Sequence, residues 1–179
     1  MTTLLVRPSS LISARLSREA ETLIWIADQA PERSLSPAES MPDIERAIVL
    51  LHAADALVFL RTPDGNPASS SGEALSEARK LYERIDRLAQ SRAPARWRVV
   101  GAVALYGCAL VDIAQRNLWD AALQLRRAAS LLCDISGYCL LVDDLIIEGF
   151  DSRRTRRVIE ELRDRVLRRV KVSVALQEA

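Results

Sequence analysis

The sequence predicts an all-α protein, a single-domain bundle of five to seven helices around one apolar central helix. Residues Val99 to Val111 form a run of thirteen residues without a charge, between Arg98 and Asp112. Such a run is shorter than the roughly 20 residues that cross a bilayer. A helix that is apolar on all sides must therefore be surrounded by other helices. Most other segments carry apolar residues on one side only, as helices packed around such a centre would.

Length and composition agree with this fold class. The chain has 179 residues, of which 49% are hydrophobic and 27% are charged. A chain of this length buries roughly 70% of its unfolded surface, so it needs no metal or disulfide to hold it together. We therefore expect one helical domain over residues 1–179, with no cofactor and no metal site.

The first predicted helix covers residues 9–29 and is peripheral to the rest. It begins after Pro8 with a serine cap and ends before Pro31. Residues 31–42 contain three prolines and are predicted to be a linker. Apolar residues recur at helical spacing on one face of the helix: Leu16, Ala20, Leu23, Ile24 and Ala27.

The core bundle is predicted over residues 43–150. Ser40 and Asp43 resemble a capping box for a helix over about 43–61, which is apolar on most sides. A long polar loop separates it from a cleanly amphipathic helix over about 73–90.

The second half of the core contains the central helix, over about 96–116, and a further helix from Asn117 to about Cys133. Residues 138–148 fit either a helix or a short strand. The pattern alone does not decide between the two.

The final helix, over 151–172, is the most basic segment, with Asp151 or Ser152 as its cap. The chain carries a net charge of +1, whereas residues 151–179 contain nine basic and five acidic residues. Such a helix can bind nucleic-acid phosphates, an acidic membrane or an acidic partner. The candidates for binding nucleic acid or an acidic partner are Arg153, Arg154, Arg157, Arg165 and Arg168. The acidic residues among these arginines favour instead a solvated face with i, i+4 ion pairs.

Cysteine usage and the N-terminus predict a cytoplasmic location. Cys108, Cys133 and Cys139 lie in apolar surroundings without a Cys-x-x-Cys spacing, which indicates reduced, buried thiols. No apolar run of signal-peptide length precedes Arg15. Only two of the 25 basic residues are lysine, a bias typical of GC-rich bacterial genes.

The only histidine, His52, is followed three positions later by Asp55. Such a pair could fix the imidazole tautomer and raise its basicity for general-base catalysis. The alternative is a core histidine hydrogen-bonded to Asp55. Arg46 and His52 also resemble the Arg-x4–6-His motif of HEPN-type ribonucleases, although Ala47 stands where that family usually has a polar residue. The resemblance implies a phosphate clamp and an acid/base for RNA cleavage.

Acidic residues near the end of the core resemble the first aspartate-rich motif of polyprenyl synthases. They are Asp143-Asp144 and Glu148, followed by Arg153-Arg154. The resemblance implies magnesium and a bound diphosphate. That family needs a second aspartate-rich helix far downstream, and only 25 residues follow Arg154. The alternative is a group of solvated acids before a capped basic helix.

The central region is similar to the flagellar export chaperone family. The residues that carry this resemblance are Val103-Ala104-Leu105-Tyr106, then Asn117 and the apolar stripe from Leu123 to Leu132. It implies an all-helical export chaperone.

The sequence contains no Gly-rich phosphate loop, metal-ligand cluster or nucleophile motif. It therefore favours a non-enzymatic protein–protein interaction module: an adaptor, an export or assembly chaperone, or a regulatory subunit. The alternative is a small nucleic-acid-acting domain, HEPN-like or RNA/DNA-binding. A homodimer or partner complex through residues 11–27 is expected, since large apolar residues exceed what the interior can hold. The candidate partner-binding residues are Leu16, Leu23, Trp25 and Trp119.

Overall fold

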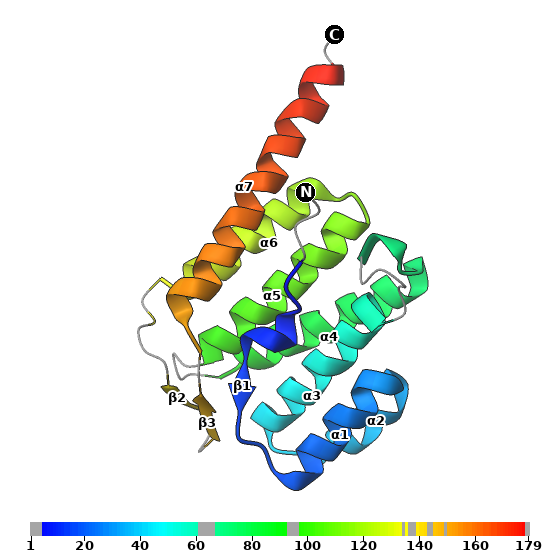
Figure 1. The fold of residues 1–179 in the computed structure, drawn as a ribbon, viewed down its shortest axis with the longest axis vertical. Coiled ribbons are helices and arrows are strands. Elements are labelled where there is room, and N and C mark those ends of the chain that lie inside the picture. The colour runs from blue at the N-terminus through cyan, green and yellow to red at the C-terminus, as the bar shows by residue number, and fades with distance from the viewer. Residues whose placement is uncertain are drawn as a thin grey trace.

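The computed structural model describes residues 5–60, 67–92, 97–133, 135, 139–142, 145–148 and 150–177. Over this part of the chain the fold is a bundle of seven α-helices with one small three-stranded sheet (Figure 1). The predicted all-α class is confirmed.

The helices are α1 (Arg18–Gln29), α2 (Pro31–Ala38), α3 (Asp43–Asp55), α4 (Gly72–Gln90), α5 (Trp97–Ala114), α6 (Leu118–Leu131) and α7 (Ser152–Gln177). Shorter helical segments are η1 (Pro8–Leu11), η2 (Ala56–Leu60) and η3 (Pro67–Ser69). The strands are β1 (Ser13–Ala14), β2 (Cys139–Val142) and β3 (Leu145–Glu148).

Helix α5 is the buried centre of the bundle. Every residue from Val99 to Asp112 is buried, and α4 and α6 pack along the helix, with α3, η1 and η3 also in contact. Among the described helices α5 alone has the length and apolar composition of a membrane span, and most of it lies inside the molecule. The predicted central helix is therefore confirmed.

The N-terminal segment differs from the predicted helix over 9–29. Its first turn is the 3-10 turn η1, β1 follows, and α1 begins only after Ser17, whose hydroxyl caps it. Two long-range partners hold this segment out of a helix. The Asp55 carboxylate accepts the Ser9 N–H at 2.7 Å, and β1 pairs antiparallel with β3.

The predicted linker over 31–42 is wrong, because this segment contains α2. Pro31 lies in the first turn of α2. Backbone N–H groups have no partner within the helix there, so the N–H that proline lacks costs no hydrogen bond. Helix α2 packs on α1 and α3. A second apolar cluster joins these three helices and is formed by Ala20, Leu23, Ala38, Met41 and Val49.

The predicted capping box of α3 is also wrong. The Ser40 hydroxyl donates to the Pro37 carbonyl at 2.9 Å, and α3 begins after Pro42 without a side-chain cap. The Asp43 carboxylate is occupied by arginine side chains, so it does not cap the helix.

The ambiguous segment over 138–148 contains strands in its described part. Strands β2 and β3 form an antiparallel hairpin in which Val142 pairs with Leu145, and β1 adds to the other edge of β3. Asp143 and Asp144, the proposed diphosphate motif, lie outside the described residues.

Helix α7 begins as predicted, with Asp151 Oδ1 accepting the Arg154 N–H at 3.0 Å. It packs against α6 and continues past residue 172, and its C-terminal end projects beyond the bundle (Figure 1). The buried side of the helix carries Ile159, Leu162, Val166 and Val170.

Candidate functional site

The structure does not form the expected pair between His52 and Asp55. His52 Nδ1 lies 3.2 Å from Asp28 Oδ1, so the imidazole on α3 bonds a carboxylate on α1. Helical spacing puts Asp55 on the same side of α3 as His52. The sequence around α3 does not indicate that Asp28 of α1 also lies beside His52. This contact holds α1 against the core.

Asp55 instead belongs to a buried network of hydrogen bonds. Its carboxylate accepts the Ser9 N–H at 2.7 Å and the Tyr82 hydroxyl at 2.5 Å. Burial raises the pKa of Asp55 to about 6, and the hydrogen bonds from Ser9 and Tyr82 oppose that rise. The carboxylate joins η1, α3 and α4, so its geometry is that of a structural crosslink.

Arg46 lies in a surface ion-pair network at the start of α3. Its guanidinium binds the Asp43 carboxylate and reaches the Glu39 backbone carbonyl at 3.4 Å. Arg84 of α4 binds Glu39, and Arg92 binds Asp43, so the network joins the α2–α3 turn to α4.

The HEPN-like site is therefore not assembled in this structure. Arg46 precedes His52 by six residues, which places the two side chains about 120° apart around α3. Each binds a different acid, and Asp55 points into the core.

A second buried carboxylate, Asp112, lies at the end of α5. Arg79 of α4 binds its Oδ1, whereas its Oδ2 has no partner among the described residues. Burial raises the pKa of Asp112 and raises the pKa of the neighbouring Cys108 thiol to about 12. The Cys108 thiol therefore stays protonated and unreactive near neutral pH.

One of the other two cysteines, Cys133, differs from the expectation of buried thiols. Cys133 is exposed, because it lies beyond the end of α6, and the Cys139 side chain is outside the described residues. Within the described ranges, no cluster of three or more His, Cys, Asp or Glu side chains is placed to hold a metal ion.

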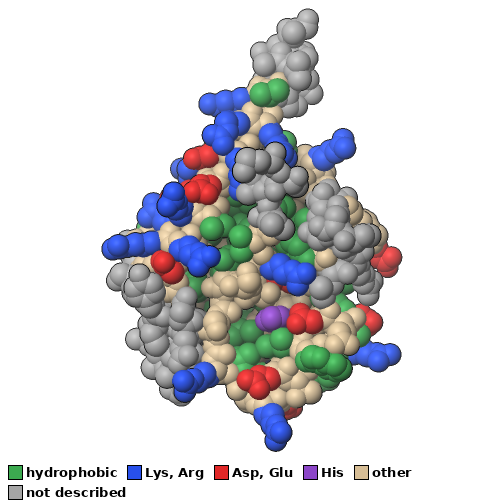
Figure 2. Space-filling view, in the orientation of Figure 1, with side chains coloured by type: hydrophobic (Ala, Val, Ile, Leu, Met, Phe, Trp, Pro, Cys, Tyr) green, Lys and Arg blue, Asp and Glu red, His purple; other side chains and the backbone are tan. Residues whose placement is uncertain are grey.

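The arginines of α7 are divided between paired and unpaired side chains. Arg157 bonds Glu161 at 2.9 Å, and Arg165 donates to the Glu161 carbonyl at 3.3 Å. Over the described residues, Arg153, Arg154 and Arg168 are exposed and make no ion pair. Figure 2 shows acidic side chains among the basic ones along this helix, as expected for a solvated face.

The four predicted partner-binding residues do not share one surface. Leu23 is buried against α2 and α3, which excludes it from any docking face, and Leu16 is half-buried between the two apolar clusters. Trp25 and Trp119 are exposed, at 64% and 67%. Leu23 and Trp25 are two residues apart on α1, so they point to nearly opposite sides of that helix.

A stripe on α6 combines exposed apolar and cationic side chains. Trp119 and Leu123 are 67% and 54% exposed, and Arg116 and Arg126 flank them three residues before and after. Within α6 this spacing places Trp119, Leu123 and Arg126 on one side of the helix, opposite the buried Ala121 and Leu125, and Arg116 lies in the turn just before the helix. We call these four residues the α6 stripe. Of these four residues only Trp119 was predicted to bind a partner, although helical spacing also places Leu123 and Arg126 beside it.

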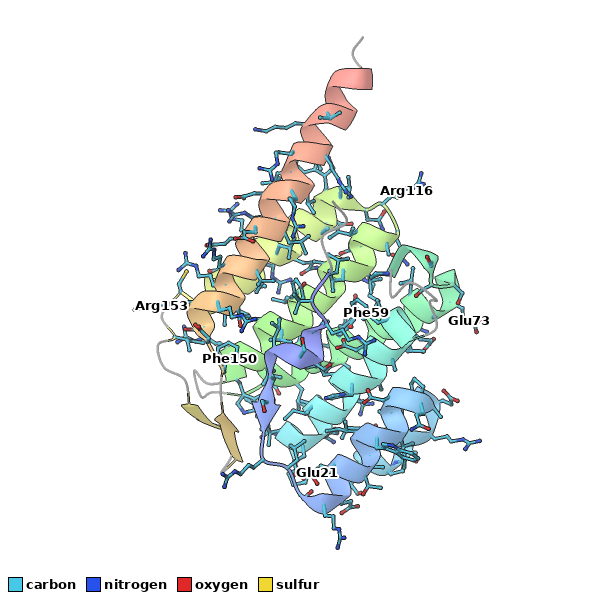
Figure 3. The ribbon with its side chains drawn as sticks, viewed as in Figure 1. Glu21, Phe59, Glu73, Arg116, Phe150 and Arg153 are labelled. Carbon is cyan, nitrogen blue, oxygen red and sulfur yellow. The ribbon has the colours of Figure 1, made fainter. Side chains whose placement is uncertain are left out.

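Arg116 is held in an unusual backbone conformation. Its φ is 65°, in the turn that ends α5. The Asn117 N–H bonds the Asp112 carbonyl at 2.8 Å and the Arg116 N–H bonds the Ile113 carbonyl at 3.1 Å, the two bonds of a Schellman motif. Glycine is the usual residue at this position. Here an arginine side chain points away from the bundle instead (Figure 3).

No known protein family, curated protein or solved structure matches the chain. The structure itself defines a helical-bundle protein whose predicted catalytic side chains form structural contacts. Its most distinctive described surface is the α6 stripe.

Proposed function

We propose that this chain is a non-enzymatic protein–protein interaction module, acting as an adaptor, an export or assembly chaperone, or a regulatory subunit in a bacterial cytoplasm. The α6 stripe carries the proposal. Tryptophan and arginine are the side chains most often responsible for binding energy at protein interfaces. An exposed Trp–Leu pair between two arginines that make no ion pair within the described residues has this composition.

The energies are large enough for a specific contact. Burying a leucine side chain contributes about 1.5–3 kcal/mol, and removing a central interface tryptophan typically costs 2 kcal/mol or more. If the two contributions together amount to roughly 4 kcal/mol, removing both side chains would weaken binding about 1,000-fold. Trp119 and Leu123 keep more than half of their surface available for such burial.

The partners of the predicted catalytic residues also support this proposal over a ribonuclease. Arg46, His52 and Asp55 are each engaged by a different group: Asp43, Asp28 and the Ser9–Tyr82 pair. A phosphate clamp and an acid/base would have to leave these bonds before they could act on one substrate.

The test is affinity capture from the native host with the wild-type chain and two variants. Trp119→Ala/Leu123→Ala should lose a partner that the wild type retains. Val172→Ala is the matched control, because Val172 is an exposed apolar residue on another helix, at 60%. All three proteins should melt at similar temperatures. Equal capture of every partner by the double variant and the wild type would contradict the proposal.

Nucleic-acid binding through α7 is the second candidate, favoured by Arg153, Arg154 and Arg168, which make no ion pair in the described part of the chain. Phosphate binding would weaken as salt rises, with a slope close to 0.9 for each neutralised duplex phosphate. Arg153→Gln/Arg154→Gln should then reduce that slope in a duplex-binding titration. Arg157 and Arg163, which lie between Arg154 and Arg168, are paired with acids, so few phosphates can be neutralised, and the absence of binding near 0.15 M salt would contradict this candidate.

A further inference from the structure

Around Trp25 the exposed side of α1 carries acidic side chains, opposite in charge to the arginines of the α6 stripe, and Arg18 lies two turns before Trp25 on the same side. Trp25 is 64% exposed, Glu21 lies one turn before it, and Asp28 lies one turn after it. Glu21 is exposed and makes no ion pair among the described residues. The Asp28 side chain is 44% exposed, with one oxygen held by His52. We call Glu21, Trp25 and Asp28 the α1 acidic face.

The two surfaces match in chemistry. The α6 stripe presents cation, two apolar side chains and cation, whereas the α1 acidic face presents anion, tryptophan and anion. Glu21 and Asp28 are about 10 Å apart along α1, at 1.5 Å per residue, whereas Arg126 lies on α6 and Arg116 in the turn before it, so the spans of the two surfaces differ. Long arginine side chains can close the difference. The charges of opposite sign beside each surface, Arg18 and Asp120, are also complementary.

We propose that a second copy of this chain covers the α6 stripe by laying its α1 acidic face across it. The inference rests on the proposed function, because it names the partner of the same stripe. The contact would bury Trp25 and Trp119 together and pair Glu21 and Asp28 with the two arginines.

One chain cannot make this contact with itself. Helix α1 packs on α2 and α3, whereas α6 packs on α5 and α7. Figure 3 shows Glu21 and Arg116 far apart, one near the bottom of the bundle and the other at its upper right side. The match must therefore be made between copies.

Charge also decides which surfaces meet. Antiparallel pairing of two α6 stripes would bring Arg116 of one copy beside Arg126 of the other, and pairing of two α1 acidic faces would bring Glu21 beside Asp28. Like charges brought together at an interface cost several kcal/mol. Unlike surfaces therefore pair. Such a contact closes into a dimer when it is made reciprocally, and otherwise extends head to tail.

The test is sedimentation velocity of the purified full chain from 5 to 200 µM. The wild type should sediment at twice the chain mass or more. Arg126→Glu places a second carboxylate against Glu21 of the next copy, and Glu21→Arg places two guanidinium groups together. Each variant alone should therefore self-associate at least tenfold more weakly. Glu73→Arg and Arg168→Glu reverse exposed charges on α4 and α7 and should behave as the wild type.

Mixing the two variants gives the most specific result. Glu21 of the Arg126→Glu protein can meet Arg126 of the other variant, and the reversed pair is again attractive. An equimolar mixture should therefore form assemblies that neither variant forms alone. A wild-type chain that stays monomeric at 200 µM would overturn this inference, yet leave the proposed function to its own capture test. Self-association that neither substitution changes would show that other surfaces make the contact, and would overturn it as well.

Discussion

The Asp55 network and the α6 stripe each combine charged groups with an aromatic ring. They differ in whether the polar groups find their bonding partners inside the chain. Asp55 receives hydrogen bonds from Ser9 and Tyr82 inside the chain, and all three groups are engaged. The stripe leaves Arg116 and Arg126 without ion pairs over the described residues, beside an exposed tryptophan. A polar group satisfied within the chain fixes the fold, whereas one left unsatisfied at the surface is free to bind a partner. Substitutions should therefore reduce stability at the first region and association at the second.

The largest effect on stability is expected from Gly107→Ala. A methyl group at Gly107 on α5 would overlap the Tyr82 ring, and the ring is wholly buried with its hydroxyl held by Asp55. The ring cannot move without losing that bond, so we expect a loss of roughly 3 kcal/mol. This would lower the melting temperature by about 6–12 °C in a domain of this size.

Gly72→Ala is the matched control. No atom lies within 4 Å of a methyl group at Gly72, at the start of α4. Alanine there should raise stability by up to about 1 kcal/mol, because it restricts the unfolded chain. Equal melting temperatures for the two variants would show that Tyr82 is not tightly packed.

Removing the Asp55 carboxylate should have the next largest effect. Asp55→Ala leaves the buried Tyr82 hydroxyl and the half-buried Ser9 N–H without this partner, which we expect to cost about 2 kcal/mol at pH 7. Asp55→Asn keeps an oxygen that can accept the Ser9 N–H and an amide N–H that can donate to the Tyr82 hydroxyl oxygen, so it should cost less than Asp55→Ala. Chemical denaturation of the two variants measures the difference.

Asp55 should also make stability depend on pH. Its pKa is about 6 in the folded protein against 3.8 for the unperturbed group, so the folded state holds the proton more tightly. The resulting stabilisation is complete below about pH 4 and is lost as pH rises through 6. The melting temperature of the wild type, relative to Asp55→Asn, should therefore fall between pH 4.5 and 7.5. A constant difference over that range would contradict the raised pKa.

The sequence predicted the helices whose signals are local. The expected bounds of α4, α5 and α6 lie within two residues of those observed, because apolar spacing and cap residues define them. The start of α1 could not be predicted in this way. Ser9 is held by Asp55 and Ser13 pairs with Glu148, and both partners are far away in the sequence.

The candidate site residues also differ in whether local sequence or distant packing determines their position. Trp119, which was predicted to bind a partner, is exposed, because it lies off the apolar side of its own helix. Leu23 was assigned to the same surface as Trp25, which helical geometry alone excludes. The Asp28 partner of His52 depends on how α1 packs, and no spacing within α3 reveals it.

His52→Gln should have a smaller effect than Asp55→Ala. The bond between His52 and Asp28 is partly exposed, so its loss should cost about 1 kcal/mol, or 2–4 °C in melting temperature. A double-mutant cycle with Asp28→Asn should give a coupling energy of similar size. A coupling near zero would show that the two side chains contribute independently.

The smallest effect, of opposite sign, is expected from Arg116→Gly. Arg116 adopts a φ of 65°, a conformation that glycine enters without a steric cost. Glycine should therefore raise stability by about 0.5–1 kcal/mol, which thermal melting can measure. The same change removes a cation from the α6 stripe and should weaken self-association in sedimentation. Arg116→Asn is the control, because asparagine tolerates this conformation but carries no charge. If both variants associate as well as the wild type, the arginine contributes nothing to the stripe. If both associate more weakly while the glycine variant melts at a higher temperature, stability and association are separate properties of this turn, as the comparison with Asp55 requires.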